Sequence, residues 1–441
     1  MGKITDYSRI TTLTGDEVIL LVQNGVTMKA TLKDIQMGEP DAKGIYPDVP
    51  MNYVEIVRYS AQTSTTVVLN GNLDMVAQIA ATAFPCTIDR NSLVTSYLNG
   101  NDVRKTADGL PSVLDDWTQP AMVRMGGIWV KYWYDSSTNT KHWRLSTKKV
   151  RGYRYKRRRY LNMYGGCVET HEEKSMLLSN SGKWTTQSKT LSAYHTAAKN
   201  LGSNFREIAT QDRELYRLYF WLMEQTFNSQ SKIRGICDVS WDWWGKFSQA
   251  GNGGQSSYAQ FYQTGITNEV SGHKGETSVT VNNGSSDVTV KPYKWLWREG
   301  MLSGPYWIWE MGYLKKAGKW YKANNINTVT SFDPTSDQYT YLCDECTQAG
   351  YILEDFKDTL IVSQTGGSDS TGHADNYWRA DDAAGNNVYI PAGVGAARRG
   401  SYLGVSVLHS DHVVSSSNPN YGGALASDDP TDPTAENTIA S

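Results

Sequence analysis

The stretch TQDRELYRLYFWLMEQTF, residues 210–227, has the clearest helical pattern in this chain. Its apolar residues recur at the i, i+3, i+4, i+7 spacing that gathers side chains on one buried face of a helix. We interpret this set as core residues rather than as a cofactor-binding motif: Leu215, Leu218, Tyr219, Leu222, Met223 and Thr226. A shorter helix is predicted just before it, over KTLSAYHTAAKNLG (189–202), with its end at Gly202.

Most other long segments are typical of strands. GGIWVKYWYD (126–135) is followed by the turn SSTNT and by KHWRLSTKKV (141–150), which predicts a hairpin. A second hairpin is predicted near the start of the chain, where DEVILLVQNG and VTMKATLKDI meet at Asn24-Gly25. The sequence therefore predicts an α+β, β-rich fold.

Composition excludes several classes of protein. The chain has 43 basic and 45 acidic residues, a balance that argues against nucleic acid or an anionic membrane as the main partner. It has no run of 18 apolar residues and no signal-peptide core, so no membrane insertion is expected. The 15 Trp and 27 Tyr against 8 Phe favour half-wet contact surfaces, since both rings keep a polar atom.

Two local patterns have competing interpretations. The basic run KKVRGYRYKRRRY (148–160) could bind single-stranded nucleic acid, but a surface strand facing solvent or a neighbouring subunit is the stronger interpretation. Cys343 and Cys346 form a single C-x-x-C motif, which lacks the second pair or nearby histidines of a zinc site. Ordinary thiols are the stronger interpretation there, so no cofactor is predicted.

Several segments, taken in order, resemble one family. These segments are LNGNDVRKTADGLPSVLDDW (98–117), AMVRMGGIWVKYWY (121–134), FREIATQDRELYRLYFWLMEQTFNSQSKIRG (205–235), WREGMLSGPYWIWEMG (297–312), TGGSDSTGHADNYW (365–378) and GAARRGSYLGVSVLHSDHVVSSSNPNYGGAL (395–425). The series is similar to the C-type-lectin-fold variable proteins of phage and prophage diversity-generating retroelements. TTLTGDEVILLVQNGVTMKATLKDI resembles the short module that opens many phage tail and head-fibre proteins.

The two resemblances imply a domain plan and a location. Residues 1–36 are expected to attach to other virion proteins, and the Pro/Gly-punctuated residues 37–50 to form a linker. A β-rich domain over 51–165 and a C-type-lectin-like ligand-binding domain over 166–426 follow. The polar residues 427–441 are expected to be disordered. The resemblance implies a homotrimer in the virion that is made in the host cytoplasm.

In that family the closing segment is the displayed, diversified face that binds a host-surface receptor or glycan. Diversification alters adenines in asparagine codons that end in a pyrimidine, and such codons never encode Trp, Met, Lys, Glu or Gln. None of these five residues occurs between Arg379 and Ala435. The resemblance therefore implies these ligand-binding residues: Arg399, Tyr402, His409, Asp411, His412, Ser416, Asn418 and Asn420.

The tetrapeptide HSDH (409–412) also has catalytic and metal-binding interpretations. Neighbouring residues of a strand point to opposite faces, so His409, Ser410 and Asp411 cannot form a catalytic relay. His409 and His412 could bind a metal, but no third ligand is evident beside them. Polar, small and aromatic side chains are those that adaptable binding surfaces use, which favours ligand binding. Tyr402, His409, Asp411 and His412 are expected to be exposed, with Leu403, Val405 and Val407 facing inward.

Two alternative functions remain open. A calcium-dependent carbohydrate lectin could use Asp381, Asp382 and Asn386, although the C-terminal domain lacks the Glu-Pro-Asn, Gln-Pro-Asp and Trp-Asn-Asp motifs of such lectins. An enzyme of the formylglycine-generating type shares the fold but depends on reactive cysteines, and none follows Cys346. The favoured interpretation is a binding protein without enzymatic activity.

Overall fold

In the part of the chain that it describes, the computed structural model is β-rich, as predicted, with 38% of residues in strands and 12% in helices. It describes residues 18–23, 26–31, 39–59, 64–233, 262–282, 287–301, 306–382, 384–394 and 402–441, with residues 18–31 as backbone only. The three α-helices in this part of the chain are α2 (Asp74–Ala80), α3 (Leu191–Leu201) and α4 (Thr210–Glu224).

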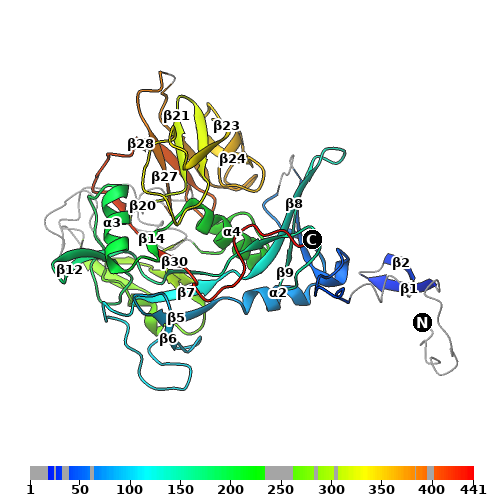
Figure 1. Ribbon diagram of the computed structural model, residues 1–441, viewed down its shortest axis with the longest axis horizontal. Coiled ribbons are helices and arrows are strands. Elements are labelled where there is room, and N and C mark those ends of the chain that lie inside the picture. The colour runs from blue at the N-terminus through cyan, green and yellow to red at the C-terminus, as the bar shows by residue number, and fades with distance from the viewer. Residues whose placement is uncertain are drawn as a thin grey trace.

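The largest sheet has ten strands and stands at the top of Figure 1, above α4. Its strands follow the order β23-β22-β21-β27-β28-β26-β24-β25, and β20 pairs with both β27 and β29. Their bounds are β20 (Trp307–Trp309), β21 (Tyr313–Lys316), β22 (Lys319–Ala323), β23 (Tyr339–Asp344), β24 (Gly350–Asp355), β25 (Val362–Thr365), β26 (Asn376–Arg379), β27 (Tyr389–Gly393), β28 (Leu408–Val413) and β29 (Tyr421–Gly422).

Two further sheets form the lower body. A six-stranded sheet has the order β14-β30-β11-β7-β5-β6, and a five-stranded sheet has the order β10-β8-β9-β3-β4. Their bounds are β3 (Val54–Tyr59), β4 (Val68–Gly71), β5 (Phe84–Ile88), β6 (Val94–Tyr97), β7 (Ala121–Met125), β8 (Ile128–Asp135), β9 (Thr140–Ser146), β10 (Arg154–Lys156), β11 (Arg159–Asn162), β14 (Phe205–Glu207) and β30 (Leu425–Asp428). Strands β8 and β9 form the hairpin that the sequence predicts.

Smaller antiparallel pieces complete the described fold. They are β1 (Val18–Gln23) with β2 (Val26–Thr31), β12 (Cys167–His171) with β13 (Lys174–Leu178), β16 (Val279–Asn282) with β17 (Asp287–Val290), and the sheet of β15 (Lys274–Glu276), β18 (Tyr293–Trp295) and β19 (Arg298–Glu299). The β1–β2 hairpin is the one predicted on either side of Asn24-Gly25. It lies apart from the rest of the chain in Figure 1.

Local sequence explains both longer helices. The Oγ1 atom of Thr190 accepts a hydrogen bond from the Ala193 amide and caps the start of α3, which ends before Gly202 as predicted. In α4, Leu215, Leu218, Tyr219 and Leu222 of the predicted face are buried, whereas Met223 is only half-buried and Thr226 lies beyond the end of the helix. Because α4 is also buried on its other sides, it forms the centre of the main core, between the sheets.

The expected domain boundary at residue 165 does not separate two packing units. In the six-stranded sheet β11, from the first segment, pairs with β30, from the end of the second. The expected linker is likewise packed where the structure describes it: Ile45 is buried and Tyr46 bridges to Val150. These segments share one core because strands distant in sequence complete one another's sheets.

The expectation of a disordered C-terminal tail is wrong. Residues 437–440 run antiparallel to β10 (Arg154–Lys156), where the Tyr155 amide donates to the Thr438 carbonyl and the Ala440 amide donates to the Tyr153 carbonyl, at 2.9 and 3.0 Å. Ala440 is buried. The tail packs because the basic run 148–160 offers it backbone hydrogen-bonding groups and positively charged side chains. The backbone and the carboxylates of the tail pair with them.

Ion pairs tie this tail to the basic run. Glu436 contacts Arg159 at 2.8 Å, and Asp432 contacts Arg158 at 3.4 Å. Asp429 contacts Arg124 of β7 at 3.2 Å. Part of the basic run therefore faces the chain's own carboxylates, and the surface-strand interpretation is corrected: Arg159 is buried rather than facing solvent.

Candidate functional site

The closing segment occupies the middle of the ten-stranded sheet. Strand β28 pairs antiparallel with β27 and parallel with β26, which makes it one of the inner strands. The residues before it are held from below: the Val405 amide donates to Ser229 Oγ at 3.1 Å and the Ser406 amide donates to Asp375 Oδ2 at 2.8 Å. Arg213 of α4 also donates to the Val405 carbonyl at 3.2 Å.

The predicted burial before β28 is confirmed, but the predicted alternation is not. Leu403, Val405 and Val407 are buried with at most 1% of their surface exposed, and Tyr402 is 42% exposed; Ser406 and Leu408, however, are buried too. The Tyr402 ring lies 5.5 Å from that of Tyr351, centroid to centroid. Tyr402 is thus an exposed aromatic side chain on a firmly anchored backbone.

A β-bulge reshapes β28 directly after His409. Ile390 of β27 faces His412, but Ala392 faces His409, so Ser410 and Asp411 together oppose the single residue Pro391. Proline has no amide hydrogen to donate to the ladder, and bulges are where sheets accommodate it. The extra residue rotates the strand, so that His409 and His412 reach the same side despite their odd spacing.

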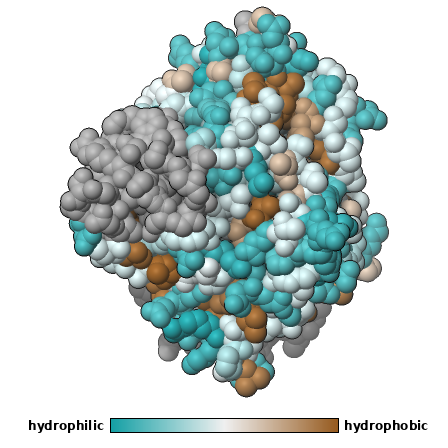
Figure 2. All heavy atoms as spheres, turned by 90° about the vertical axis from the view of Figure 1, so that its left-hand side faces the viewer, coloured by the Kyte–Doolittle hydropathy of each residue, from teal (hydrophilic) through white to brown (hydrophobic). Residues whose placement is uncertain are grey.

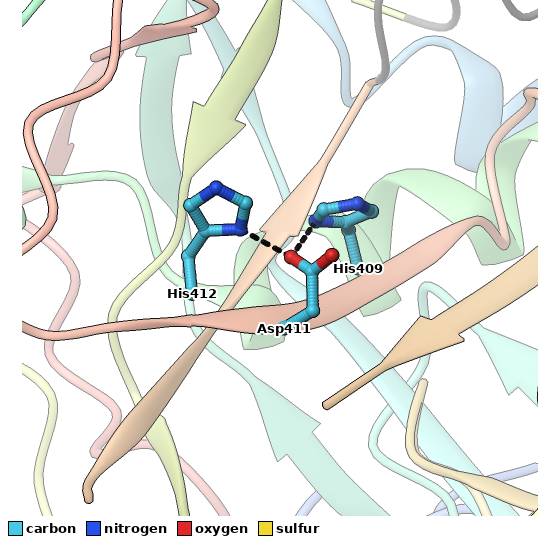
Figure 3. A group of neighbouring side chains, drawn as sticks. All are labelled: His409, Asp411 and His412. Carbon is cyan, nitrogen blue, oxygen red and sulfur yellow. Dashed lines mark hydrogen bonds and ion pairs between the residues drawn. The ribbon is translucent and has the colours of Figure 1, made fainter. Parts of the chain in front are cut away.

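Figure 3 shows the resulting cluster of His409, Asp411 and His412. The Nδ1 atom of His409 lies 3.0 Å from Asp411 Oδ1, and the Nδ1 atom of His412 contacts the same oxygen. From β29, the hydroxyl of Tyr421 lies 2.9 Å from His409 Nδ1 and 3.1 Å from His412 Nδ1. Four polar atoms from two strands therefore converge on one small volume.

Aromatic rings hold this cluster in place. Trp307 of β20 stacks on His409 at 4.4 Å, and Trp309 stacks on Tyr421 at 3.7 Å with an interplanar angle of 9°. The two tryptophans are two residues apart in one strand, so both point to the same face. Their signal in the sequence is the alternation in WIW (307–309), which sequence reasoning did not connect to the closing segment.

The carboxylate of Asp411 is the charged centre of the cluster. Burial opposes its ionisation, but hydrogen bonds from His409 and His412 outweigh that effect and lower the pKa of Asp411 below its ordinary value. The side chains of Asp411 and His412 are 33% and 23% exposed. The cluster is therefore open on the His412 side and closed by tryptophan on the His409 side.

The structure places the predicted ligand-binding residues in different environments. His409 is buried, so the expectation that it is exposed is wrong; Trp307 covers its ring. Asn420 is also buried, and its carbonyl accepts a hydrogen bond from the Trp307 amide at 2.9 Å. Ser416 is half-buried and Asn418 is exposed. Arg399 lies outside the described residues.

The structure also bears on the catalytic and metal-binding interpretations of HSDH. Ser410 points away from the cluster, toward the Tyr377 hydroxyl and the Trp378 carbonyl, which agrees with the argument against a catalytic relay. The expectation that no third metal ligand lies near His409 and His412 is wrong. Asp411 supplies one because the bulge turns it between the two rings.

The acidic residues considered for calcium binding already pair with other groups of this protein, and Cys343 is unreactive. Asp382 accepts hydrogen bonds from the Asn386 and Asn387 amides at 3.2 and 3.0 Å, and Asp381 pairs with Arg379 at 3.4 Å. Burial raises the pKa of the Cys343 thiol to about 12, so it is not a reactive thiolate.

No protein-family model matches this chain, and no curated protein matches it either. Among the described helices, none combines the length and the apolar character that crossing a lipid bilayer requires.

Proposed function

We propose that this protein is a phage virion component that binds a host-surface receptor or glycan through the exposed part of its closing segment. The observation that carries the proposal is Tyr402, an exposed aromatic ring at the start of an anchored segment in the central sheet. Exposed tyrosines on rigid backbone provide large contact area at a low cost in conformational entropy. Trp378 and Tyr351 flank it and extend the aromatic surface.

Polar groups of the same closing segment complete the proposed face. Asp411, His412 and Ser416 are partly exposed, and Asn418 is exposed. Figure 2 views the molecule from the left-hand side of Figure 1 and shows that polar residues predominate among the coloured residues there, with apolar residues in scattered patches. The side chains named for the proposed face combine an aromatic ring with carboxylate, imidazole, hydroxyl and amide groups, which suits a hydrated polar ligand such as a glycan or a receptor loop.

We include three further properties of the protein in this proposal. A C-type-lectin-like fold for the C-terminal half, attachment to the virion through residues 1–36, and a homotrimer are supported by the sequence resemblances alone. The role proposed is binding rather than catalysis.

The direct test measures adsorption. The full-length chain, labelled with a fluorophore, is incubated with intact cells of the bacterial strain that carries the gene and of related strains, and bound fluorescence is measured after washing. We expect saturable binding to at least one strain. Failure to bind any strain, or binding that the double substitution Tyr402→Ala and Asn418→Ala leaves unchanged, would contradict the proposal.

The expected diversification has a separate test. Sequencing the DNA around the gene should reveal a reverse transcriptase gene and a near-copy of the codons for residues 379–426. If both are absent, the expectation of diversification is contradicted. The adsorption experiment then tests the binding role by itself.

A further inference from the structure

We propose that His409, Asp411, His412 and Tyr421 form a binding site for one divalent transition-metal ion, with Zn²⁺ as the best fit. Three of these residues, His409, Asp411 and His412, have donor atoms that all lie within 4.8 Å of one another, the group of possible metal ligands found within the described residues. The proposal rests on this cluster; Asp411 and His412 also belong to the proposed host-binding face, but metal titration tests the site without any host cell.

The spacing of the donor atoms is close to that of a zinc site. A tetrahedral Zn²⁺ with metal–ligand distances of about 2.0–2.1 Å places its donor atoms about 3.3 Å apart. Three of the contacts in the cluster measure 2.9, 3.0 and 3.1 Å, and the contact between His412 and Asp411 is closer. A small outward movement of partly exposed His412 would open the space that a central ion needs.

The donor atoms of the cluster also suit a cation. The Nδ1 atoms of His409 and His412 face the same Asp411 oxygen, and a neutral imidazole offers its Nδ1 lone pair when its proton is on Nε2. An ion at the centre would therefore be bound by both imidazoles in that tautomer and by the ionised carboxylate at once.

The site is built on rigid elements. His409, Asp411 and His412 come from an inner strand with a bulge fixed opposite Pro391, and Tyr421 comes from β29, which pairs with β20. Stacking by Trp307 and Trp309 fixes the rings of His409 and Tyr421 before any ion arrives. Preorganisation of this kind separates a built metal site from acidic side chains that meet by chance on a surface.

The donor set selects the class of metal. Two imidazole nitrogens with one carboxylate suit Zn²⁺, Cu²⁺ or Ni²⁺, whereas Ca²⁺ prefers six to eight oxygen ligands. The fourth position would be taken by the Tyr421 oxygen or by water. The exposed edge of His412 provides the entry path for the ion.

The experiment uses the full-length chain stripped of metal with EDTA. Isothermal titration with ZnCl₂ should show one site per chain, and saturation should raise the melting temperature. Titration with CoCl₂ should give the intense visible absorption of four-coordinate cobalt. Asp411→Asn and His412→Gln should each weaken Zn²⁺ binding by at least about tenfold and abolish the cobalt spectrum.

His171→Gln is the matched control. His171 also pairs with a carboxylate, Glu169 at 3.1 Å, and stacks on Trp117 at 4.6 Å, but it has a single imidazole. Its substitution should leave both titrations unchanged. Absence of the cobalt absorption, or Zn²⁺ binding of equal strength in wild type and in His412→Gln, would overturn the proposal. Because His412 is partly exposed, His412→Gln is expected to fold. It therefore tests the proposed metal site even if Asp411→Asn fails to fold.

Discussion

At the scale of single residues, Tyr402 is the strongest candidate for direct contact with a ligand. Tyr402→Ala should weaken adsorption to host cells by about 1–2 kcal/mol or more, since exposed aromatic anchors dominate many interfaces. Stability should change by no more than roughly 0.5 kcal/mol because the ring is 42% exposed. Adsorption per folded molecule and thermal melts measure the two effects.

The matched control is Tyr341→Ala, which alters a tyrosine that is 51% exposed on β23 of the same sheet. It should leave adsorption unchanged. If Tyr402→Ala melts early while adsorption per folded molecule is unaffected, the face assigned to this segment is inverted.

Val405 should show the opposite behaviour to Tyr402. Its side chain is 1% exposed and packs in the main core, so Val405→Asp would bury an unpaired charge. We expect a loss of about 3–5 kcal/mol in the free energy of unfolding. Urea titration followed by circular dichroism measures it, and a wild-type midpoint would show that the segment does not pack inward in solution.

The carboxyl of Asp375, beneath the closing segment, should make the stability of the protein depend on pH. Burial raises the pKa of its carboxyl from 3.8 to about 8, although Arg213 and Arg217 act in the opposite direction. Between these two values the folded state holds a proton that the unfolded state has lost, so stability falls as pH rises from about 4 to 8.

Asp375→Asn should remove this contribution and flatten stability against pH. It keeps a side-chain oxygen to accept the hydrogen bond from the Ser406 amide. The free energy of unfolding is measured by urea titration at several pH values between 4 and 8. Parallel curves for wild type and variant would show that Asp375 does not bind a proton on folding in this range.

At the scale of elements, the C-terminal tail should stabilise the fold. Deleting residues 430–441 should lower the melting temperature by several degrees, because it removes Asp432 and Glu436 from Arg158 and Arg159. An unchanged melting temperature would show that the tail does not dock.

Glu436→Gln isolates the charge contribution of the tail. Burial opposes ionisation of Glu436, but the charges of Arg159 and Lys156 outweigh it and lower the pKa of the carboxyl. The stabilisation is therefore present above the unfolded pKa and is lost as pH falls below about 4. The substitution should destabilise the protein at pH 7, as measured by thermal melts. Glu172→Gln, in an exposed pair with Arg90, should cost less than about 1 kcal/mol.

At the scale of the whole molecule, the main question is assembly. The sequence resemblances predict a homotrimer. Light scattering on the purified full-length chain at micromolar concentration should report three times the chain mass. A monomer without partners at that concentration would contradict the trimer and leave the metal-site proposal unaffected.

Local sequence alone determined several elements of this protein. Helices α3 and α4 and the hairpins β1–β2 and β8–β9 follow from periodicity and turn chemistry, which act over a few residues. The resemblance series, by contrast, is the source of the proposed function and of the expected ligand-binding set. Neither source indicated that Asn420 would be buried, because its burial depends on the pairing of β20 with the closing loop.

Only the tertiary structure decided how distant segments use their polar groups. The polar tail looks disordered in sequence because its partners, Arg158 and Arg159, lie more than 270 residues earlier in the chain. The cluster of His409, Asp411 and His412 depends on a bulge that arises from pairing with Pro391. Charge pairing and strand register depend on which segments meet in space, and a single strand's pattern does not contain that information.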